Sequence, residues 1–174
     1  MDAAQPSVDK ERVFGSLRSA LMHLQRNYGY LLENDLNERT ITHKLAEYLR
    51  PMFPELEVDC EYNRDGHDPK RVNLEDRPVE EWGAGSNVYP DIIVHHRGDN
   101  LHNVLIVEAK KARRLGGQVD DHDRTKIEAF ARELQYSFGA AVTLRIGEEE
   151  GDRIEVAFHS DEGWHPSEVV QPAS

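Results

Sequence analysis

The sequence predicts an α/β domain in which helices flank one mixed β-sheet. Two stripes of apolar residues at helical spacing come first, several short apolar runs with strand character follow, and one more helical stripe interrupts those runs. The length of 174 residues suits one hydrophobic core and is short for two. We therefore expect a single domain over residues 1–174, with flexible ends at about residues 1–9 and 163–174.

The first part of the chain predicts two amphipathic helices. One extends from Lys10 to about Leu32, and its apolar residues recur at helical spacing. They are Val13, Leu17, Leu21 and Leu24. A second helix of about 14 residues follows Asn34 and Asp35 and ends before Pro51, with a stripe that begins at Ile41 and Leu45.

The rest of the chain predicts five strands and a third helix. Alternation of apolar and charged residues predicts a half-buried strand over 56–60, and the aperiodic segment 63–87 predicts a long surface excursion. Strands over 88–95 and 103–109 are joined by a hairpin-type loop from Arg97 to Asn100. A helix over 120–138, ended by Gly139, precedes strands over 140–146 and 153–158.

Composition and charge exclude several classes of protein. The net charge of −12 argues against loose, nonspecific attraction to a polyanion, although a local basic groove is compatible with it. No apolar run approaches the roughly 18 to 20 residues that span a bilayer, and residues 1–6 lack the layout of a signal peptide. Cys60 is the single cysteine, so an intrachain disulfide is excluded. We expect a cytoplasmic protein without a membrane partner.

Three charged residues interrupt two apolar strands. Asp91 precedes the run Ile-Ile-Val, and Glu108 and Lys110 end the run that begins at Val104. Such side chains are rarely buried without a partner. Alternation places Glu108 and Lys110 on one face of their strand. A hairpin centred on the Gly98 and Asp99 turn, with His96 facing Asn103, sets Asp91 opposite Glu108. The simplest structural alternative is an ordinary ion pair between Glu108 and Lys110, with Asp91 flanking a turn.

The predicted patch suits a divalent metal ion. Two neighbouring carboxylates repel each other, and a hard cation held by Asp91 and Glu108 would relieve that repulsion while leaving positions for water and a phosphate. Such a cation lowers the pKa of a bound water. Lys110 would then orient that water or offset the charge that develops on the phosphate.

Glu38 is a candidate fourth member of the patch. It precedes Ile41 by three residues and Leu45 by seven, which places it on the apolar side of the second helix. The alternative is a capping box, because Asp35 lies three residues before Glu38. The spacing leaves both interpretations open.

Pro90 and Asp91, followed by Glu108, Ala109 and Lys110, resemble the signature of the PD-(D/E)xK nuclease superfamily. The resemblance covers roughly residues 35–146. It implies a restriction-endonuclease-like, three-layer α/β/α core with a central mixed sheet of four to five strands. It also implies Mg²⁺ or Mn²⁺, hydrolysis of phosphodiester bonds, and an additional acidic metal ligand at Glu38.

Basic residues beside the patch are candidate nucleic-acid contacts. Lys111, Arg113 and Arg114 follow Lys110 directly, and Lys126 lies on the third helix. A solvated charged face is the alternative for this run. We read the acidic residues from Asp120 to Asp123 as complements to the helix dipole, and the histidines near residue 95 as surface groups or phosphate contacts, because their spacing fits no zinc pattern.

The sequence thus favours a metal-dependent endonuclease acting on nucleic acid, DNA in preference to RNA. A nuclease-fold protein that binds or regulates without catalysis is the main alternative, motivated by the acidity and small size of the chain. A nucleic-acid mimic is a third, against which the mixing of charges along the chain argues. A homodimer or a separate protein partner stays open.

Overall fold

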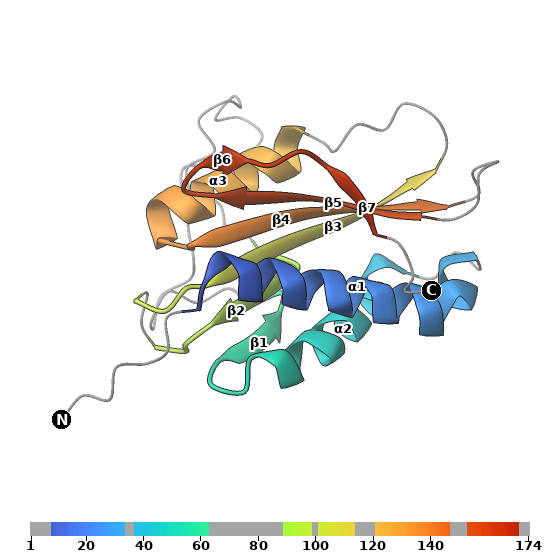
Figure 1. Ribbon diagram of the computed structural model, residues 1–174, viewed down its shortest axis with the longest axis horizontal. Coiled ribbons are helices and arrows are strands. Elements are labelled where there is room, and N and C mark those ends of the chain that lie inside the picture. The colour runs from blue at the N-terminus through green and yellow to red at the C-terminus, as the bar shows by residue number, and fades with distance from the viewer. Residues whose placement is uncertain are drawn as a thin grey trace.

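In the computed structural model, helices lie on both faces of one mixed β-sheet (Figure 1). The structure describes residues 8–33, 37–62, 89–98, 101–113, 121–146 and 153–170. The helices of this part are α1 (Lys10–Glu33), α2 (Glu38–Leu49), a short 3-10 turn η1 (Arg50–Met52) and α3 (Asp121–Leu134). The strands are β1 (Glu57–Cys60), β2 (Ile92–His95), β3 (Leu105–Arg113), β4 (Phe138–Ile146), β5 (Arg153–Ser160), β6 (Gly163–Trp164) and β7 (Glu168–Val170).

The strands pair in the order β1-β2-β3-β4-β5-β6, and β7 pairs with β5. Neighbours along this order are antiparallel except β3 and β4, which are parallel. Parallel neighbours require a crossover connection, and α3 lies within that connection. The predicted α/β class with a mixed sheet is therefore confirmed, and the described residues form a sheet of seven strands instead of the expected four or five.

The alternation of side chains along the strands divides the core into two layers. On one face, Ile92 and Val107 pack in a cluster with the buried residues of α1 and α2. On the other face, Ile93 and Ile106 pack with Ile127 and other apolar residues of α3. Glu108 and Lys110 follow Ile106 at steps of two, so they lie on the α3 side of the sheet.

The register between β2 and β3 is the one predicted from the hairpin. Ile92 pairs with Val107, and Val94 pairs with Leu105. Gly98 has a φ of 95°, a left-handed conformation that favours glycine in a tight loop. Continuing the ladder by one residue sets Asp91 opposite Glu108. Of the predicted loop from Arg97 to Asn100, residues 99 and 100 lie outside the described residues.

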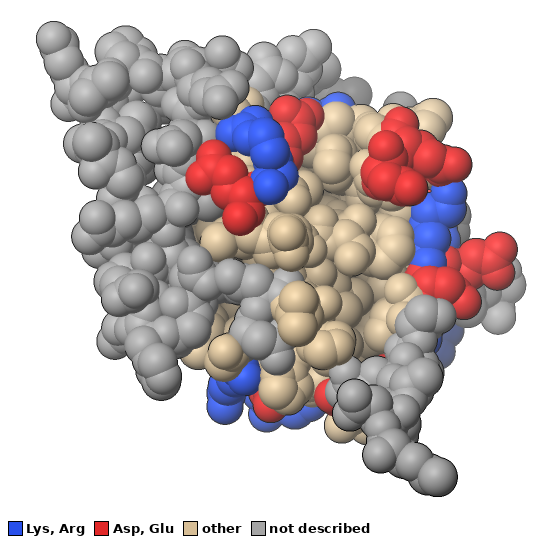
Figure 2. Space-filling model, turned by 90° about the vertical axis from the view of Figure 1, so that its left-hand side faces the viewer, with Lys and Arg blue, Asp and Glu red and all other residues tan. Residues whose placement is uncertain are grey.

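The end of the molecule that carries the β2–β3 loop has a mixed charge. Figure 2 shows that Lys and Arg side chains lie beside Asp and Glu side chains in small groups, around a central area of other residues.

His95, predicted as a surface group or phosphate contact, is instead buried: its Nε2 lies 3.0 Å from Asp59 Oδ2. Arg97 Nε donates to the same oxygen at 2.8 Å. At this end, paired charges argue against the acidic-mimic alternative.

The prediction of a helix over 120–138 was wrong at its C-terminal end. α3 ends at Leu134, Gln135 takes a left-handed φ of 57°, and β4 already begins at Phe138. Gly139 is therefore a strand residue. A Cβ at Gly139 would lie 2.2 Å from Ile127 Cγ2, so the glycine is required by the close packing of α3 on β4 and has no capping role.

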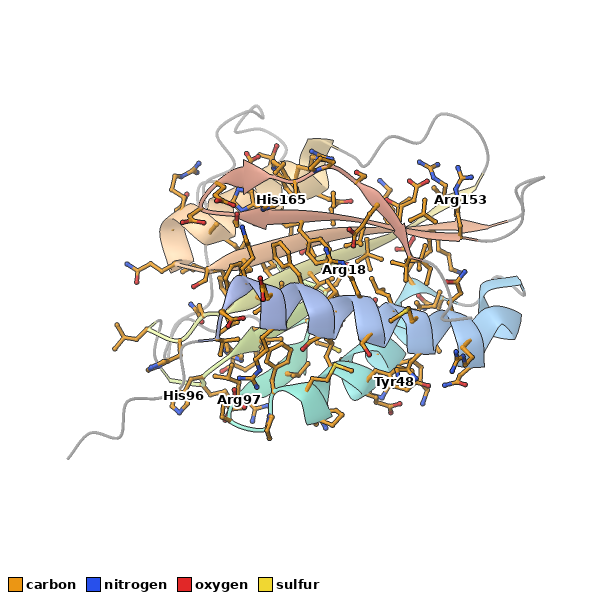
Figure 3. The ribbon with its side chains drawn as sticks, viewed as in Figure 1. Arg18, Tyr48, His96, Arg97, Arg153 and His165 are labelled. Atoms are coloured by element: carbon orange, nitrogen blue, oxygen red, sulfur yellow. The ribbon has the colours of Figure 1, made fainter. Side chains whose placement is uncertain are left out.

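The prediction of a weakly ordered tail from residue 163 was also wrong for residues 163–170. β6 and β7 in this segment pair with β5, which enlarges the sheet. Ion pairs connect this segment and the turn before it to α1: Arg18 pairs with Glu168, and Lys10 Nζ lies 2.6 Å from Glu162 Oε2 in the turn. Figure 3 shows Arg18 on α1 facing the strands, where its guanidinium lies 4.9 Å from the ring centre of Phe158.

Two other predictions lie outside the described residues. These are the surface excursion over 63–87 and the flexible start of the chain up to residue 7. Within the part that is described, no helix combines the length and the apolar character needed to cross a membrane.

Candidate functional site

Asp91 is held by both strands that neighbour it. Its backbone carbonyl accepts a hydrogen bond from Glu61 N at 3.2 Å, which continues the β1–β2 ladder. Its side-chain Oδ2 accepts from the backbone amide of Ala109 at 2.7 Å. β3 continues beyond the start of β2, so this carboxylate binds an amide that no β2 residue reaches. The Asp91 carboxylate is thereby fixed beside Glu108.

Glu38 accepts a hydrogen bond from β3 two residues beyond Ala109, the residue that Asp91 binds. Its Oε1 accepts from the backbone amide of Lys111 at 3.1 Å. Glu38 is the first residue of α2, and the N-cap is Asn37, whose side chain accepts from Arg39 N. The capping-box alternative, which places Glu38 three residues inside the helix, is therefore wrong; Asp35 itself lies outside the described residues.

Glu108 is a buried carboxylate with one unsatisfied oxygen. Its exposed fraction is 5%, and its Oε2 lies 2.8 Å from Lys126 Nζ. Among the described residues, Glu108 Oε1 has no hydrogen-bond partner. Buried polar atoms are nearly always paired, so this carboxylate oxygen is free to accept a further donor, such as a water molecule, or a cation.

The electrostatics of the site favour a bound cation. Burial raises the pKa of Glu108 to about 8. The positive charge of Lys126 lowers this pKa, and the negative charge of Asp91 raises it further. Burial also raises the pKa of Asp91, although the Ala109 amide and Lys126 oppose this shift. Both carboxyl groups thus lose a proton less readily than usual, and a divalent cation would stabilise their charged forms.

Two residues of α3 belong to this environment. Lys126 was predicted as a nucleic-acid contact, but its side chain is 11% exposed and pairs with Glu108. Asp123 was assigned to the helix dipole, yet its charge raises the pKa of both Asp91 and Glu108. The spacing of three residues between Asp123 and Lys126 places them on one helix face, and this signal could have linked them.

The basic residues after Glu108 are only partly described. Lys110 is exposed and lies on the same strand face as Glu108. In the parallel β3–β4 ladder its backbone lies opposite Thr143. Lys111 is half-buried, and its amide is bound by Glu38. Arg113 ends β3, but its side chain lies outside the described residues, as does the whole of Arg114. Nucleic-acid contacts by these residues stay a prediction.

The donor set fits a hard divalent cation. Asp91 and Glu108 offer carboxylate oxygens, and Glu108 Oε1 is buried and has no partner among the described residues. Within that same part of the chain, no three Asp, Glu, His or Cys side chains form a ready metal-binding group. Mg²⁺ commonly binds one or two carboxylates and completes its shell with water and substrate phosphate. Glu38 as an additional ligand stays a prediction.

Comparison with known proteins adds no assignment. No protein-family model, no curated protein and no solved structure matches this chain.

Proposed function

We propose that this protein is a metal-dependent nuclease that hydrolyses phosphodiester bonds of nucleic acid, DNA in preference to RNA. The observation that carries the proposal is the buried Oε1 of Glu108, which has no partner in the described part of the chain and lies opposite the fixed carboxylate of Asp91. A divalent cation, in addition to the Lys126 ammonium, would stabilise the charged form of this carboxylate. The adjacent exposed Lys110 supplies a positive charge at the same strand face.

Each residue has a distinct role in this proposal. Asp91 and Glu108 would hold Mg²⁺ or Mn²⁺, and the metal would supply Lewis acidity and a bound water of lowered pKa. Lys110 would orient the attacking water or stabilise charge on the phosphate. Glu38 would support the site by fixing the end of β3 through the amide of Lys111.

A cleavage assay tests the proposal. The purified chain, incubated with DNA or RNA and Mg²⁺ or Mn²⁺, should cut at least one of these substrates and should lose the activity in EDTA. Asp91→Asn, Glu108→Gln and Lys110→Met should each lower the rate by at least about a hundredfold.

Lys10→Met is the matched control for the loss of a lysine. Lys10 lies in an exposed ion pair with Glu162, so this variant should cut at the wild-type rate. Undiminished cleavage by the folded Asp91 and Lys110 variants would refute the assignment.

A nuclease-fold protein that binds or regulates without catalysis is the second candidate. The ion pair between Lys126 and Glu108 favours it, because a carboxylate that is already paired with an ammonium needs a metal less. Calorimetry separates the two candidates. Absence of Mn²⁺ binding at millimolar concentration would favour the binding protein, and saturable binding that Asp91→Asn abolishes would favour the nuclease.

A further inference from the structure

Lys126 occupies a central position between two parts of the site. Its Nζ lies 2.8 Å from Glu108 Oε2 and donates to the backbone carbonyl of Tyr89 at 2.7 Å. Tyr89 lies two residues before Asp91, in the segment that leads into β2. The ammonium therefore connects α3, the buried carboxylate on β3 and the approach to Asp91.

The packing of α3 fixes this ammonium in place. Ile127, the next residue, is fully buried and packs with Ile93 and Ile106 of the sheet. Lys126 itself is 11% exposed on its side chain, which leaves its charge poorly hydrated. Such an ammonium is stable only where acceptors surround it, and Glu108 together with the Tyr89 carbonyl provides them.

The same carboxylate cannot easily hold two cations. A divalent ion bound by Glu108 and Asp91 would lie within a few ångströms of the Lys126 ammonium, because that ammonium contacts Glu108 directly. The two cations would repel each other in a poorly hydrated site. Lys126 has a long flexible stem, and a change of rotamer carries its ammonium several ångströms away.

We propose that Lys126 is a built-in counter-cation, which offsets part of the negative charge of the Asp91–Glu108 pair in the absence of metal and is displaced from Glu108 when a divalent cation binds. This inference rests on the proposed function. It assigns Lys126 a regulatory role, in which the ammonium lowers the metal affinity of the site and stabilises the carboxylates until metal arrives.

Metal affinity measured on the intact chain tests this role. Mn²⁺ titration by calorimetry should show that Lys126→Met, which keeps much of the stem and removes the charge, binds Mn²⁺ at least about tenfold more tightly than the wild type. Lys10→Met, which removes a lysine from an exposed pair with Glu162, should leave the affinity unchanged. Equal or weaker binding by Lys126→Met would overturn the counter-cation role.

Chemical labelling of the unaltered chain provides a second measurement, which decides the question even if Lys126→Met fails to fold. Acetylation mapped by mass spectrometry should modify Lys126 slowly in EDTA and several-fold faster with saturating Mn²⁺, while the labelling of Lys10 stays constant. Equal protection of Lys126 in both conditions would overturn the proposal.

The outcomes also separate this inference from the proposed function. Saturable Mn²⁺ binding by the wild type, lost in Asp91→Asn but unchanged in Lys126→Met, would overturn the role of Lys126 alone. Absence of Mn²⁺ binding in both the wild type and Lys126→Met would overturn the metal site itself, and the counter-cation with it.

Discussion

The side-chain carboxylate of Asp91 accepts a hydrogen bond from the backbone amide of Ala109, with 2.7 Å between Oδ2 and N. This contact joins the start of β2 to a part of β3 that extends beyond it. One side chain thus has two separable properties: the carboxylate charge, which suits a metal ion, and the acceptor oxygen, which fixes the strand. A pair of substitutions distinguishes them.

Asp91→Asn should keep the acceptor and lose the charge, whereas Asp91→Ala should lose both. Because the Ala109 amide is then left without its acceptor, we expect Asp91→Ala to be less stable than Asp91→Asn by about 1–3 kcal/mol. Urea unfolding in EDTA measures this difference. Equal stability of the two variants would show that the hydrogen bond does not hold the strand.

Glu38 should protect the amide of Lys111 from exchange with solvent. Glu38→Ala removes the acceptor of that amide, so its hydrogen exchange should accelerate, whereas Glu38→Gln offers an amide oxygen in the same place and should retain most of the protection. Exchange measured by NMR in EDTA tests this. The Ala109 amide, bound by Asp91, is the internal reference, and its rate should stay constant in both variants.

The contribution of Glu108 to the stability of the metal-free protein should fall as the pH rises from about 4.5 to 8. The pKa of Glu108 is about 8 in the folded chain, against 4.5 for an ordinary glutamate, so the folded state binds more protons than the unfolded state within this window. A rising pH therefore favours unfolding within this window. Below about pH 4.5 the ionisation of Glu108 no longer changes the free energy of unfolding. The loss should be on the order of a few kcal/mol.

Glu108→Gln is the variant that tests this pH dependence, because glutamine cannot ionise. In EDTA its free energy of unfolding should vary less with pH between 5 and 8 than that of the wild type, and the variant should be the more stable of the two at pH 8. An identical slope in both proteins would mean that Glu108 does not titrate in this range.

Gly139→Ala should destabilise the protein by about 1–3 kcal/mol, because the added Cβ would lie 2.2 Å from Ile127 Cγ2 and push α3 away from β4. Gly15→Ala is the matched control. No atom lies within 4 Å of the Cβ position at Gly15, which is exposed in α1, so this variant should be more stable by about 0.5–1 kcal/mol. Thermal unfolding compares the two, and a stabilising Gly139→Ala would contradict the packing described for α3.

The register of the site followed from the sequence because local rules determine it. The loop at Gly98 and the period of two along β2 and β3 are enough to set Asp91 opposite Glu108. Spacing also brought Glu38 to the site, although only the folded chain shows that its carboxylate binds the amide of Lys111.

Contacts between elements far apart in the chain could not be predicted from the sequence. Gly139 resembles a helix cap, and only the packing of α3 on β4 shows why a glycine is needed there. β6 and β7 have two and three residues, too few for a periodic pattern to emerge. Lys126 was predicted as a nucleic-acid contact because nothing local to α3 reveals that Glu108, on β3, lies 2.8 Å from its ammonium.

A crystal structure of the protein grown with Mn²⁺ tests the central claim most directly. Anomalous scattering should show a manganese ion bound by carboxylate oxygens of Asp91 and Glu108, with the Lys126 ammonium moved away from Glu108. A structure at saturating Mn²⁺ with no anomalous peak at these two residues, and with the ion pair between Lys126 and Glu108 intact, would contradict the account.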